Sequence, residues 1–502
     1  VERGIDGTKE QMIYLIADPS DSQRPVFDFN RACAGMIFAG DYWYCQGFDV
    51  TNTQDTQKGI QISGSNCVFD NIQAYHNGNT GIQVSRYLTT DEREDWPSND
   101  LILNCTSYGN ADIGYEDADG FAAKLTVGDG IVFDGCISYN NADDGWDLFA
   151  KVETGSIGSV TIKNCVAYGN GYLEDGTDAG NGNGFKMGGS SITGYHTLIN
   201  SVAFGNKAKG IDSNSCPDIQ VKQSTSFNNE SYNVAFYTNA GSKTDFGATG
   251  ILSYRTKNLT QQEQLKLLQE EATIRTTMNY FWNETKQEST NSEGNVAKDS
   301  WFVSTTDPQI TRNADGTINM NGFLTLTAEA PEGVGARMTG TPSAVFTVAA
   351  DVVNNDDDDD DDNSGSSAAP AVDWTDVSSS VQNKVAEMLQ NPAIASVNMN
   401  FVCSGEVKVP QNVLNTIKGT KLTVAFHSGN GVALSISGQD LKNKDLSKIQ
   451  NIDLTVDQTS NTIPANVVSA KSGTVNRQLG IRDTGSFGVN VNIHVNVGKD
   501  NS

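Results

Sequence analysis

The chain has 502 residues, which is too long for one ordinary hydrophobic core, so we expect at least two domains or a repetitive architecture. Lys and Arg number 34 against 61 Asp and Glu, and the formal net charge is -27. This charge argues against nucleic acid or an anionic membrane surface as a partner. No apolar run approaches the roughly 20 residues that span a bilayer, so we expect no transmembrane segment.

The eight cysteines include no CxxC pair, so neither a disulfide framework nor a zinc site is expected. The sequence starts at Val1 without a Met, and no secretory signal is present. We interpret this start as the interior of a longer protein whose leader would not be visible.

A short motif recurs from about residue 45. It ends in Ala or Ser, an aromatic residue, one further residue and Asn, and its copies are separated by loops of different length. A constant motif with uneven spacing predicts short strands joined by loops that accept insertions. Units of three such strands favour an all-β fold, a right-handed parallel β-helix, over leucine-rich repeats or propeller blades. The copies run over 71–77, 104–110, 135–141, 164–170, 200–206 and 223–229.

Equivalent residues of successive coils in a β-helix stack about 4.8 Å apart. Cys105, Cys136 and Cys165 are therefore expected to form an inward ladder. The Asn residues that close the same copies, at 110, 141 and 170, are expected to form a ladder of side-chain hydrogen bonds at the turn. Both ladders are interpreted as structural.

The pattern changes after about residue 256. A capping box spans 260–263, and Leu265, Leu268 and Ala272 follow at helical spacing. We expect this helical region to cover the end of the solenoid. Turns and short strands are expected over 315–323, and the first domain is predicted to span 1–345.

A linker is predicted over 346–372 because its seven consecutive Asp residues, 356–362, repel one another and cannot fold. A second, small β-rich domain with some helix (α+β) is predicted over 373–502. It is expected to contain a helix with Val377, Val381, Val385 and Leu389 on one face.

The strands expected in this second domain alternate apolar and polar residues. They comprise a hairpin of 422–426 with 432–436 and a long strand over 487–497. No cluster of titratable residues marks the domain as catalytic, and we interpret it as an attachment or binding module.

The repeats also align on a Gly that starts the strand after each motif. Asp119 and Asp144 precede this Gly in successive units, and Asp143 comes just before Asp144. The apolar residue after the Gly points inward, so Trp146 belongs to the core and Asp147 points outward. These four carboxylates are expected within about 5 to 8 Å of one another on adjacent coils.

Such a set of oxygen ligands suits Ca²⁺ better than zinc, since neither His nor Cys lies on this face. A solvated acidic turn is the simpler alternative, because Asp-Gly pairs are common in turns. The cluster on stacked coils favours the calcium site, with Asp119, Asp143, Asp144 and Asp147 as ligands.

Lys186 is the outward residue of the next unit, in the same column as Asp147. A surface Lys paired with an Asp is the plain alternative. Beside a divalent cation, however, the pKa of a lysine falls, and a neutral amine can act as a base. A metal and a base side by side suit proton removal from the carbon next to a carboxylate, followed by β-elimination in a uronic-acid polymer.

Three segments carry a family resemblance: 117–121, 141–149 with its Asp-Asp-Gly-Trp-Asp block, and 181–189. Over about residues 1–345 the chain resembles the pectate lyases of polysaccharide lyase family 9. The resemblance implies a right-handed parallel β-helix that cleaves polygalacturonate by calcium-dependent β-elimination. It implies Asp119, Asp143, Asp144 and Asp147 as calcium ligands and Lys186 as the base.

Two features depart from the family pattern. The chain starts inside the helix, so we expect the first coils and the N-terminal cap to be missing, at some cost in stability or activity. The loop 171–182 is acidic, with Glu174, Asp175 and Asp178, which could give it a different substrate preference or another bound ion.

Further candidates lie near the predicted site. The amines are expected to contact substrate carboxylates, or else to be plain solvated lysines, and the aromatic rings to contact sugar faces. They are Lys124, Lys151, Lys207 and Lys209, with Tyr115 and Tyr172.

Two other functions stay open at this point. A pectin hydrolase would need two carboxylates about 5 to 9.5 Å apart, which Asp143 could form with Asp144 or Asp119. However, the Gly-His-Gly and Arg-Ile-Lys elements of that family are absent from the sequence. A non-catalytic adhesin stabilised by calcium would explain the acidic cluster and the second domain, but would give Lys186 no task.

The partner expected from the sequence is a pectic polysaccharide, bound through Ca²⁺ because both polymer and protein are acidic. The protein is expected to be a monomer that is secreted by, or attached to, a bacterial cell. Endo or exo action, tolerance of methyl esters and a preference for rhamnogalacturonan are all left open by the sequence.

Overall fold

The computed structural model describes residues 1–9, 11–18, 21–239, 242–256, 263–266, 271–346, 374–390, 397–403, 406–428, 432–446, 451–457, 478–480 and 492–495. The chain divides into two compact units. The first comprises Val1–Ala17 and Gln23–Ser343, and the second comprises Asp18–Ser22 and Ala344–Ser502.

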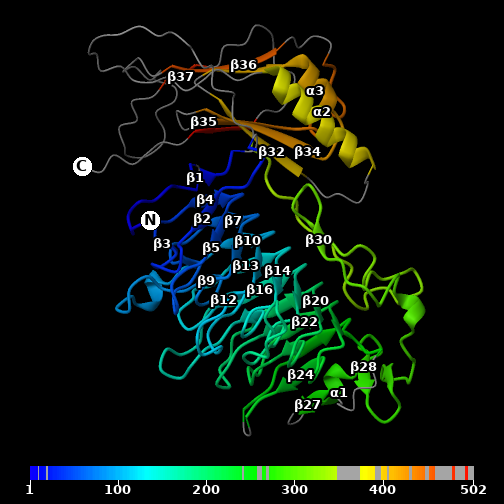
Figure 1. Ribbon diagram of the computed structural model, residues 1–502. Coiled ribbons are helices and arrows are strands. Elements are labelled where there is room, and N and C mark those ends of the chain that lie inside the picture. Colours follow the sequence, from blue (N-terminus) through cyan, green and yellow to red (C-terminus); the bar gives the residue numbers. More distant parts are fainter. Residues whose placement is uncertain are drawn as a thin grey trace. The chain divides into compact units, whose positions relative to one another are not determined.

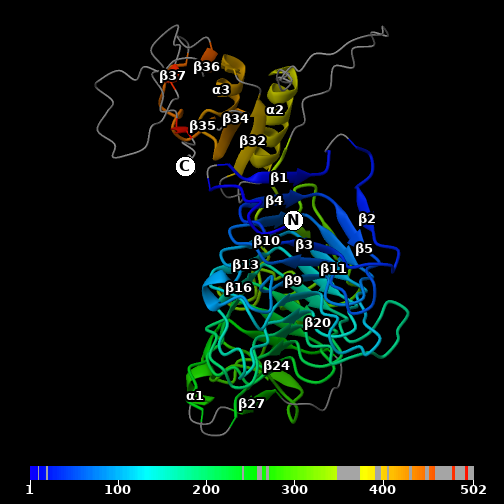
Figure 2. The same cartoon turned by 90° about the vertical axis from the view of Figure 1, so that its left-hand side faces the viewer.

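The first unit is a right-handed parallel β-helix, as the repeats predicted. Its chain visits three parallel sheets in turn, and each coil pairs with the coils before and after it (Figures 1 and 2). Each sheet contains nine strands within the described residues.

The first sheet consists of β1 (Ile13–Ile16), β4 (Trp43–Gln46), β7 (Val68–Asp70), β10 (Leu101–Leu103), β13 (Ile131–Asp134), β16 (Val160–Lys163), β19 (Thr197–Ile199), β22 (Gln220–Lys222) and β25 (Gly247–Thr249). The second consists of β2 (Val26–Asp28), β5 (Asp49–Thr51), β8 (Gln73–Tyr75), β11 (Thr106–Tyr108), β14 (Ile137–Tyr139), β17 (Val166–Tyr168), β20 (Val202–Phe204), β23 (Thr225–Phe227) and β26 (Leu252–Tyr254). The third consists of β3 (Met36–Phe38), β6 (Ile60–Ile62), β9 (Ile82–Val84), β12 (Phe121–Ala123), β15 (Trp146–Asp147), β18 (Phe185–Lys186), β21 (Ile211–Asp212), β24 (Val234–Tyr237) and β27 (Gln264–Lys266).

The core is built of columns of like residues, because alternate strand residues point inward and neighbouring coils are in register. Cys105, Cys136 and Cys165 are fully buried, which confirms the predicted inward ladder. Trp146 is also buried, and its ring stacks on Phe121 of the preceding coil, with centroids 4.8 Å apart. The inward direction predicted for Trp146 is therefore confirmed.

The predicted asparagine ladder is confirmed and runs over six coils. Five Nδ2 groups donate to Oδ1 of the next Asn in the ladder at 2.8 to 3.0 Å, and all six side chains are buried. Inside the protein these amides satisfy one another at turns where water is absent. The ladder consists of Asn77, Asn110, Asn141, Asn170, Asn206 and Asn229.

Replacement of a central ladder residue tests this role. Asn141→Ala removes the acceptor of Asn110 and the donor to Asn170, and leaves buried polar groups unpaired. We expect a loss of about 2 to 5 kcal/mol in the free energy of unfolding, measured by urea titration. The exposed Asn239 provides the control, since Asn239→Ala should leave the urea midpoint unchanged. Equal midpoints for both variants would contradict the role of the ladder.

The prediction of a helix at the end of the solenoid is wrong at Leu265. Gln264–Lys266 instead forms β27, which extends the third sheet by pairing with β24. The buried carboxylate of Glu263 accepts a hydrogen bond from the Val234 amide at 2.7 Å, and this bond fixes the extended entry into β27. Helix is described only at α1 (Glu271–Ile274), while 260–262 and Leu268 lie outside the described residues.

The chain then leaves the end of the β-helix and packs against the outer face of the second sheet. Arg312 binds it there, donating to the carbonyl oxygens of Cys105 (2.6 Å) and Gly135 (2.9 Å). The elements of this segment are β28 (Phe281–Asn283), β29 (Glu288–Thr290), the 3-10 helix η2 (Asp299–Trp301), β30 (Thr311–Arg312) and β31 (Ile318–Asn319); a further 3-10 helix, η1 (Arg93–Asp95), lies in an earlier loop.

Further along, the same segment is held by side chains of successive coils. Asn200 accepts from the Arg337 amide, Asp134 accepts from the Thr341 hydroxyl and Asp70 accepts from the Ser343 hydroxyl, each at 2.6 Å. The segment therefore runs back along the solenoid, from the coil of β19 to the coil of β7.

Within its described residues, the second unit contains two helices and two small sheets. The predicted helix with Val377 and Val381 on its buried face is confirmed as α2, and the predicted hairpin is confirmed as the antiparallel pair β34 and β35. The predicted final strand is described only over Asn492–Val495, and the acidic run 356–362 lies outside the described residues. The elements are α2 (Trp374–Gln390), α3 (Gln411–Ile417), β32 (Val397–Cys403), β33 (Glu406–Pro410), β34 (Leu422–Ser428), β35 (Val432–Ser437), β36 (Asn451–Asp457), β37 (Gln478–Gly480) and β38 (Asn492–Val495).

Candidate active site

The outward face of the third sheet carries the charged residues predicted from the repeats. Strand register places Ala122 of β12, Asp147 of β15, Lys186 of β18 and Asp212 of β21 in one column. A second column precedes the strands and carries Asp119 and Asp144 on adjacent coils, because the Gly120 amide donates to the Asp144 carbonyl oxygen. Charged groups distant in sequence thus become neighbours about 4.8 Å apart.

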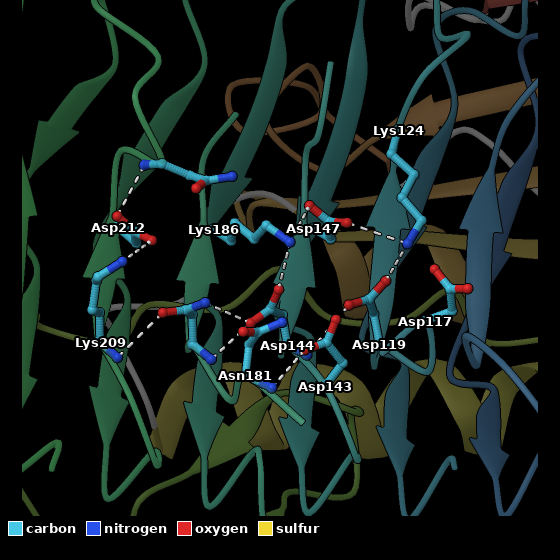
Figure 3. Close-up of polar contacts among 12 residues, drawn as sticks. Asp117, Asp119, Lys124, Asp143, Asp144, Asp147, Asn181, Lys186, Lys209 and Asp212 are labelled. Carbon is cyan, nitrogen blue, oxygen red and sulfur yellow. Dashed lines mark hydrogen bonds and ion pairs between the residues drawn. The ribbon is translucent and has the colours of Figure 1, made fainter. Parts of the chain in front are cut away.

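Three carboxylates form a tight cluster. Asp119, Asp144 and Asp147 each offer an oxygen atom, all within 4.8 Å of one another, and all three residues are buried. Asp143 lies beside this cluster and is not one of the three; one of its oxygens accepts a hydrogen bond from the Asn181 amide at 2.9 Å (Figure 3). The described carboxylates thus gather mainly as the sequence predicted.

Two lysines neutralise part of this charge. Lys186 Nζ lies 2.9 Å from Asp144 and 3.4 Å from Asp147. Lys124 Nζ lies 2.6 Å from Asp119 and 3.2 Å from Asp147, so Asp147 stands between the two amines (Figure 3). The Phe149 ring, with its centroid 5.7 Å from Lys186 Nζ, adds a cation-π contact.

The cluster carries more negative than positive charge. Four carboxylates, including Asp143, face two ammonium groups, and burial removes much of the screening by water. Burial and the neighbouring carboxylates raise the pKa of Asp119 to about 7, although Lys124 opposes the shift. Burial and the neighbouring carboxylates raise the pKa of Asp143 to about 9. The site therefore has a deficit of positive charge.

The loop after β17 positions two of the carboxylates. Asn183 donates its backbone amide and its Nδ2 group to one oxygen of Asp144, both at 2.7 Å. Lys207 Nζ donates to the carbonyl oxygens of Ala179 (2.8 Å) and Gly180 (2.9 Å), and it also pairs with Asp178. The loop is thus held by Asp144 and by Lys207.

Comparison with known proteins defines the family. Residues 1–245 match a family model described as Pel9A-like, right handed beta helix region. Pectate lyase L of Paenibacillus polymyxa (strain SC2) is 41% identical over 352 residues, which cover 68% of this chain and 73% of that protein. The chain belongs to the Pel9A-like pectate lyases. The resemblance to polysaccharide lyase family 9 inferred from the sequence is confirmed.

Two further comparisons bear on this Pel9A-like chain. Pectate lyase L of Thermoclostridium stercorarium is 43% identical over 258 residues, which cover 51% of this chain and 21% of that protein. The chain thus spans only a small part of that relative. A solved rhamnogalacturonan lyase structure has a TM-score of 0.53 and 24% identity, covering 66% of this chain and 83% of that chain, and supports the fold.

The substrate-binding candidates of this Pel9A-like chain fall into distinct groups. Lys124 belongs to the charged cluster itself. Lys207 donates a hydrogen bond to a carbonyl oxygen of the loop, and Lys209 pairs with Asp212 at 2.8 Å. For the half-buried Lys151 and Tyr115, the described residues provide no side-chain hydrogen bond or ion pair.

The acidic loop, which the sequence left as a determinant of substrate preference or a site for another ion, has carboxylates that are dispersed. Glu174 contacts His76 at 2.6 Å, Asp175 accepts the Thr177 amide at 2.9 Å, and Asp178 pairs with Lys207. Tyr172, expected at a sugar face, donates its hydroxyl to Glu230 at 2.7 Å. In the described part of the chain, the one group of three potential ligands is the cluster around Asp144.

Sequence reasoning missed two features of the site. It placed Lys124 among substrate contacts, whereas this amine bridges Asp119 and Asp147. It also gave no task to Asn183, although the residue occupies the same position before Gly as Asp119 and Asp144. That shared position was the available signal for its contact with Asp144.

The donor atoms fit a hard divalent cation. Asp144 Oδ2 and Asp147 Oδ1 are buried, and the ion-pair partner of both within the described residues is Lys186 Nζ, at 2.9 and 3.4 Å. The cluster offers oxygen atoms alone, and hard cations such as Ca²⁺ and Mg²⁺ prefer these ligands. Together with the two ammonium groups, the two charges of an added cation would balance the four carboxylates when all four are ionised.

The buried pair of Lys124 and Asp119 can be tested by mutation. Lys124→Met should lower the free energy of unfolding in a chelator by about 3 to 5 kcal/mol, because Asp119 is left buried without its ion-pair partner. Urea titration measures the loss. Lys286→Met is the matched control, since Lys286 is exposed, and it should change stability by less than about 0.5 kcal/mol. A similar small effect for both would rule out the proposed electrostatic role of Lys124.

Within the parts of the chain that the structure describes, no helix combines the length and the apolar character needed to cross a bilayer.

Proposed function

We propose that this chain is a pectate lyase that cleaves 1,4-linked galacturonan by calcium-dependent β-elimination, with Lys186 as the general base. The observation that carries the proposal is the position of Lys186, 2.9 Å from a carboxylate of a cluster whose oxygens suit a divalent cation. Pectate lyases among the relatives support the substrate class.

The ligands proposed for Ca²⁺ are Asp119, Asp144 and Asp147, with Asp143 at their side. A bound Ca²⁺ supplies positive charge that neutralises these carboxylates and withdraws electron density from a uronate carboxylate. The protein holds the ligands apart from bulk water, and Asn183 fixes the orientation of Asp144.

Lys186 needs a neutral Nζ before it can act as a base. Burial lowers the Lys186 pKa, but Asp144, Asp147 and the other carboxylates outweigh burial and hold the pKa well above its ordinary value in the ion-free protein. Neutralisation of these carboxylates leaves burial as the main effect, so the amine can lose its proton.

The neutral amine then takes the proton from C5 of the uronate. The electron pair of the broken C5–H bond forms the C4–C5 double bond, the C4–O4 bond breaks, and O4 leaves with its electrons and takes a proton from water. The products are an unsaturated uronide and a shortened chain. No nucleophile is required.

A pectic polysaccharide is too large to enter a cell, and we therefore place the reaction outside a bacterial cell, by secretion or surface attachment. We infer a monomer, because one solenoid contains every group of the proposed site.

Chelation tests the metal requirement. With polygalacturonate, the protein should produce near-ultraviolet absorbance from an unsaturated uronide in Ca²⁺, lose it in EDTA and recover it when Ca²⁺ is restored. New reducing ends without absorbance would instead indicate hydrolysis, and neither signal would indicate a non-catalytic adhesin. Either result would refute the lyase proposal.

Replacement of the base separates chemistry from metal binding. Lys186→Ala should lower kcat by about 10²- to 10⁴-fold, the usual contribution of a general base. Calcium binding, followed by calorimetry, should persist, since the three carboxylates remain and a competing ammonium is gone. A variant that turns over substrate at the wild-type rate would disprove the role of Lys186.

A further inference from the structure

The outward face of the third sheet continues beyond the acidic cluster toward the N-terminal coils. In the column of Ala122 and Asp147, strand register places Gln83 on β9 and Gln61 on β6. Along this column the face therefore changes from acidic groups to neutral amides. A polymer that occupies the cluster can extend over these coils without repulsion by carboxylates.

Lys58 lies on one of these two coils, two residues before β6 begins. It precedes Gly59 as Asp119 precedes Gly120, and the Gly59 amide donates to the Thr80 carbonyl oxygen as the Gly81 amide donates to that of Asp119. Lys58, Thr80 and Asp119 thus occupy one column, with Lys58 two coils from Asp119. At the spacing of stacked strands, their backbones lie about 10 Å apart.

Lys58 lacks a partner for its charge. The side chain is half-buried, yet it makes no hydrogen bond or ion pair with any residue that the structure describes. Burial and the nearby Lys124 lower the Lys58 pKa. The exposed Asp117 raises this pKa through its charge, without a hydrogen bond or ion pair to Lys58. By contrast, Lys124, Lys186 and Lys209 each pair with an Asp. Burial of an ammonium group away from water costs free energy when no anion pairs with it, so the position suits an incoming anion.

Gln83, on the next coil and opposite Gln61, provides a second unsatisfied group. The residue is 6% exposed, and its Oε1 atom accepts no hydrogen bond in the described structure, while its Nε2 group donates to Ser85 Oγ at 3.1 Å. A buried carbonyl oxygen without a donor is rare in folded proteins. A sugar hydroxyl is a donor of suitable size and chemistry for it.

We propose that Lys58 and Gln83 form a second uronate subsite, in which the ammonium group pairs with a carboxylate of the polymer and the amide oxygen accepts a sugar hydroxyl. This inference rests on the proposed lyase function, because the cluster around Asp144 would hold a different sugar of the same chain. Two carboxylates must then be free, one at the cluster and one at Lys58. The protein therefore selects unesterified pectate, since a methyl ester at the subsite leaves Lys58 unpaired.

Steady-state kinetics of the full chain test the subsite. Lys58→Met should raise KM for polygalacturonate about 10-fold or more with little change in kcat, as expected for a lost charge-assisted contact. Lys58→Arg should restore most of the affinity, and high salt should reduce the difference between variant and wild type. Lys222→Met, at an exposed lysine of the first sheet, is the charge-matched control and should leave KM unchanged.

Stability distinguishes binding from a structural role. Because Lys58 is unpaired, Lys58→Met should unfold at the same or a higher urea concentration than wild type, whereas loss of a structural contact would lower the midpoint. An unchanged KM, or a fall in kcat alone, would overturn the subsite. On partially methyl-esterified pectin, the KM difference between Lys58→Met and wild type should be smaller than on polygalacturonate, and an equal difference on both substrates would overturn the pairing with a carboxylate.

Binding without turnover separates this inference from the proposed function. In a Lys186→Met background, calorimetry with a galacturonate oligomer in Ca²⁺ reports affinity alone. If wild type has no lyase activity but Lys58→Met still weakens oligomer binding, the lyase proposal fails and the subsite stands. If wild type is active and oligomer affinity is the same with and without Lys58, the subsite fails and the lyase proposal stands.

Discussion

The in-register stacking of parallel coils is the constraint on which this protein depends. Each coil pairs its backbone amides with the next, so a residue at one position meets its equivalent about 4.8 Å away. For asparagines, aromatic rings and buried thiols this proximity is favourable, as in the bonds from Asn110 to Asn141 and from Asn141 to Asn170. For carboxylates it is unfavourable, and the same geometry concentrates negative charge where Asp119 and Asp144 follow each other.

The chemistry of the site arises from this imposed proximity. Asp147 cannot move away from its neighbours, because its backbone is part of β15. Lys124 and Lys186 relieve the repulsion only in part, since two ammonium groups face four carboxylates. A flexible loop with the same residues would separate its charges in water. The rigid solenoid keeps an excess of negative charge at the site before any ligand arrives.

Much of the architecture was predictable because the period of the repeats is visible in the sequence. Once Asn110 and Asn141 are aligned, Trp146 must point inward and Lys186 must follow Asp147, and both are found so. Side-chain reach was not predictable from the period. Lys124 extends back to Asp119 and across to Asp147, and Lys207 binds carbonyl oxygens of the loop.

Local pattern misled the prediction at the end of the solenoid. Leu265 stands at helical spacing from its neighbours, but pairing with β24 places it in a strand. Helical propensity is a local quantity, whereas an open sheet edge offers hydrogen bonds that a short helix cannot match. Such edges occur where a repeat array stops, and sequence periodicity carries no information there.

The segment that returns along the solenoid alters how the array responds to stress. In a simple repeat protein each coil is stabilised by its neighbours alone, so terminal coils can fray one at a time. Here Arg337, Thr341 and Ser343 connect one stretch of chain to the coils of Asn200, Asp134 and Asp70, and Arg312 adds a further bond at Cys105. Opening of a single coil must break a tether shared with distant coils. The solenoid is therefore expected to unfold as one cooperative body, and the face that carries the acidic cluster keeps its register until the whole structure is lost.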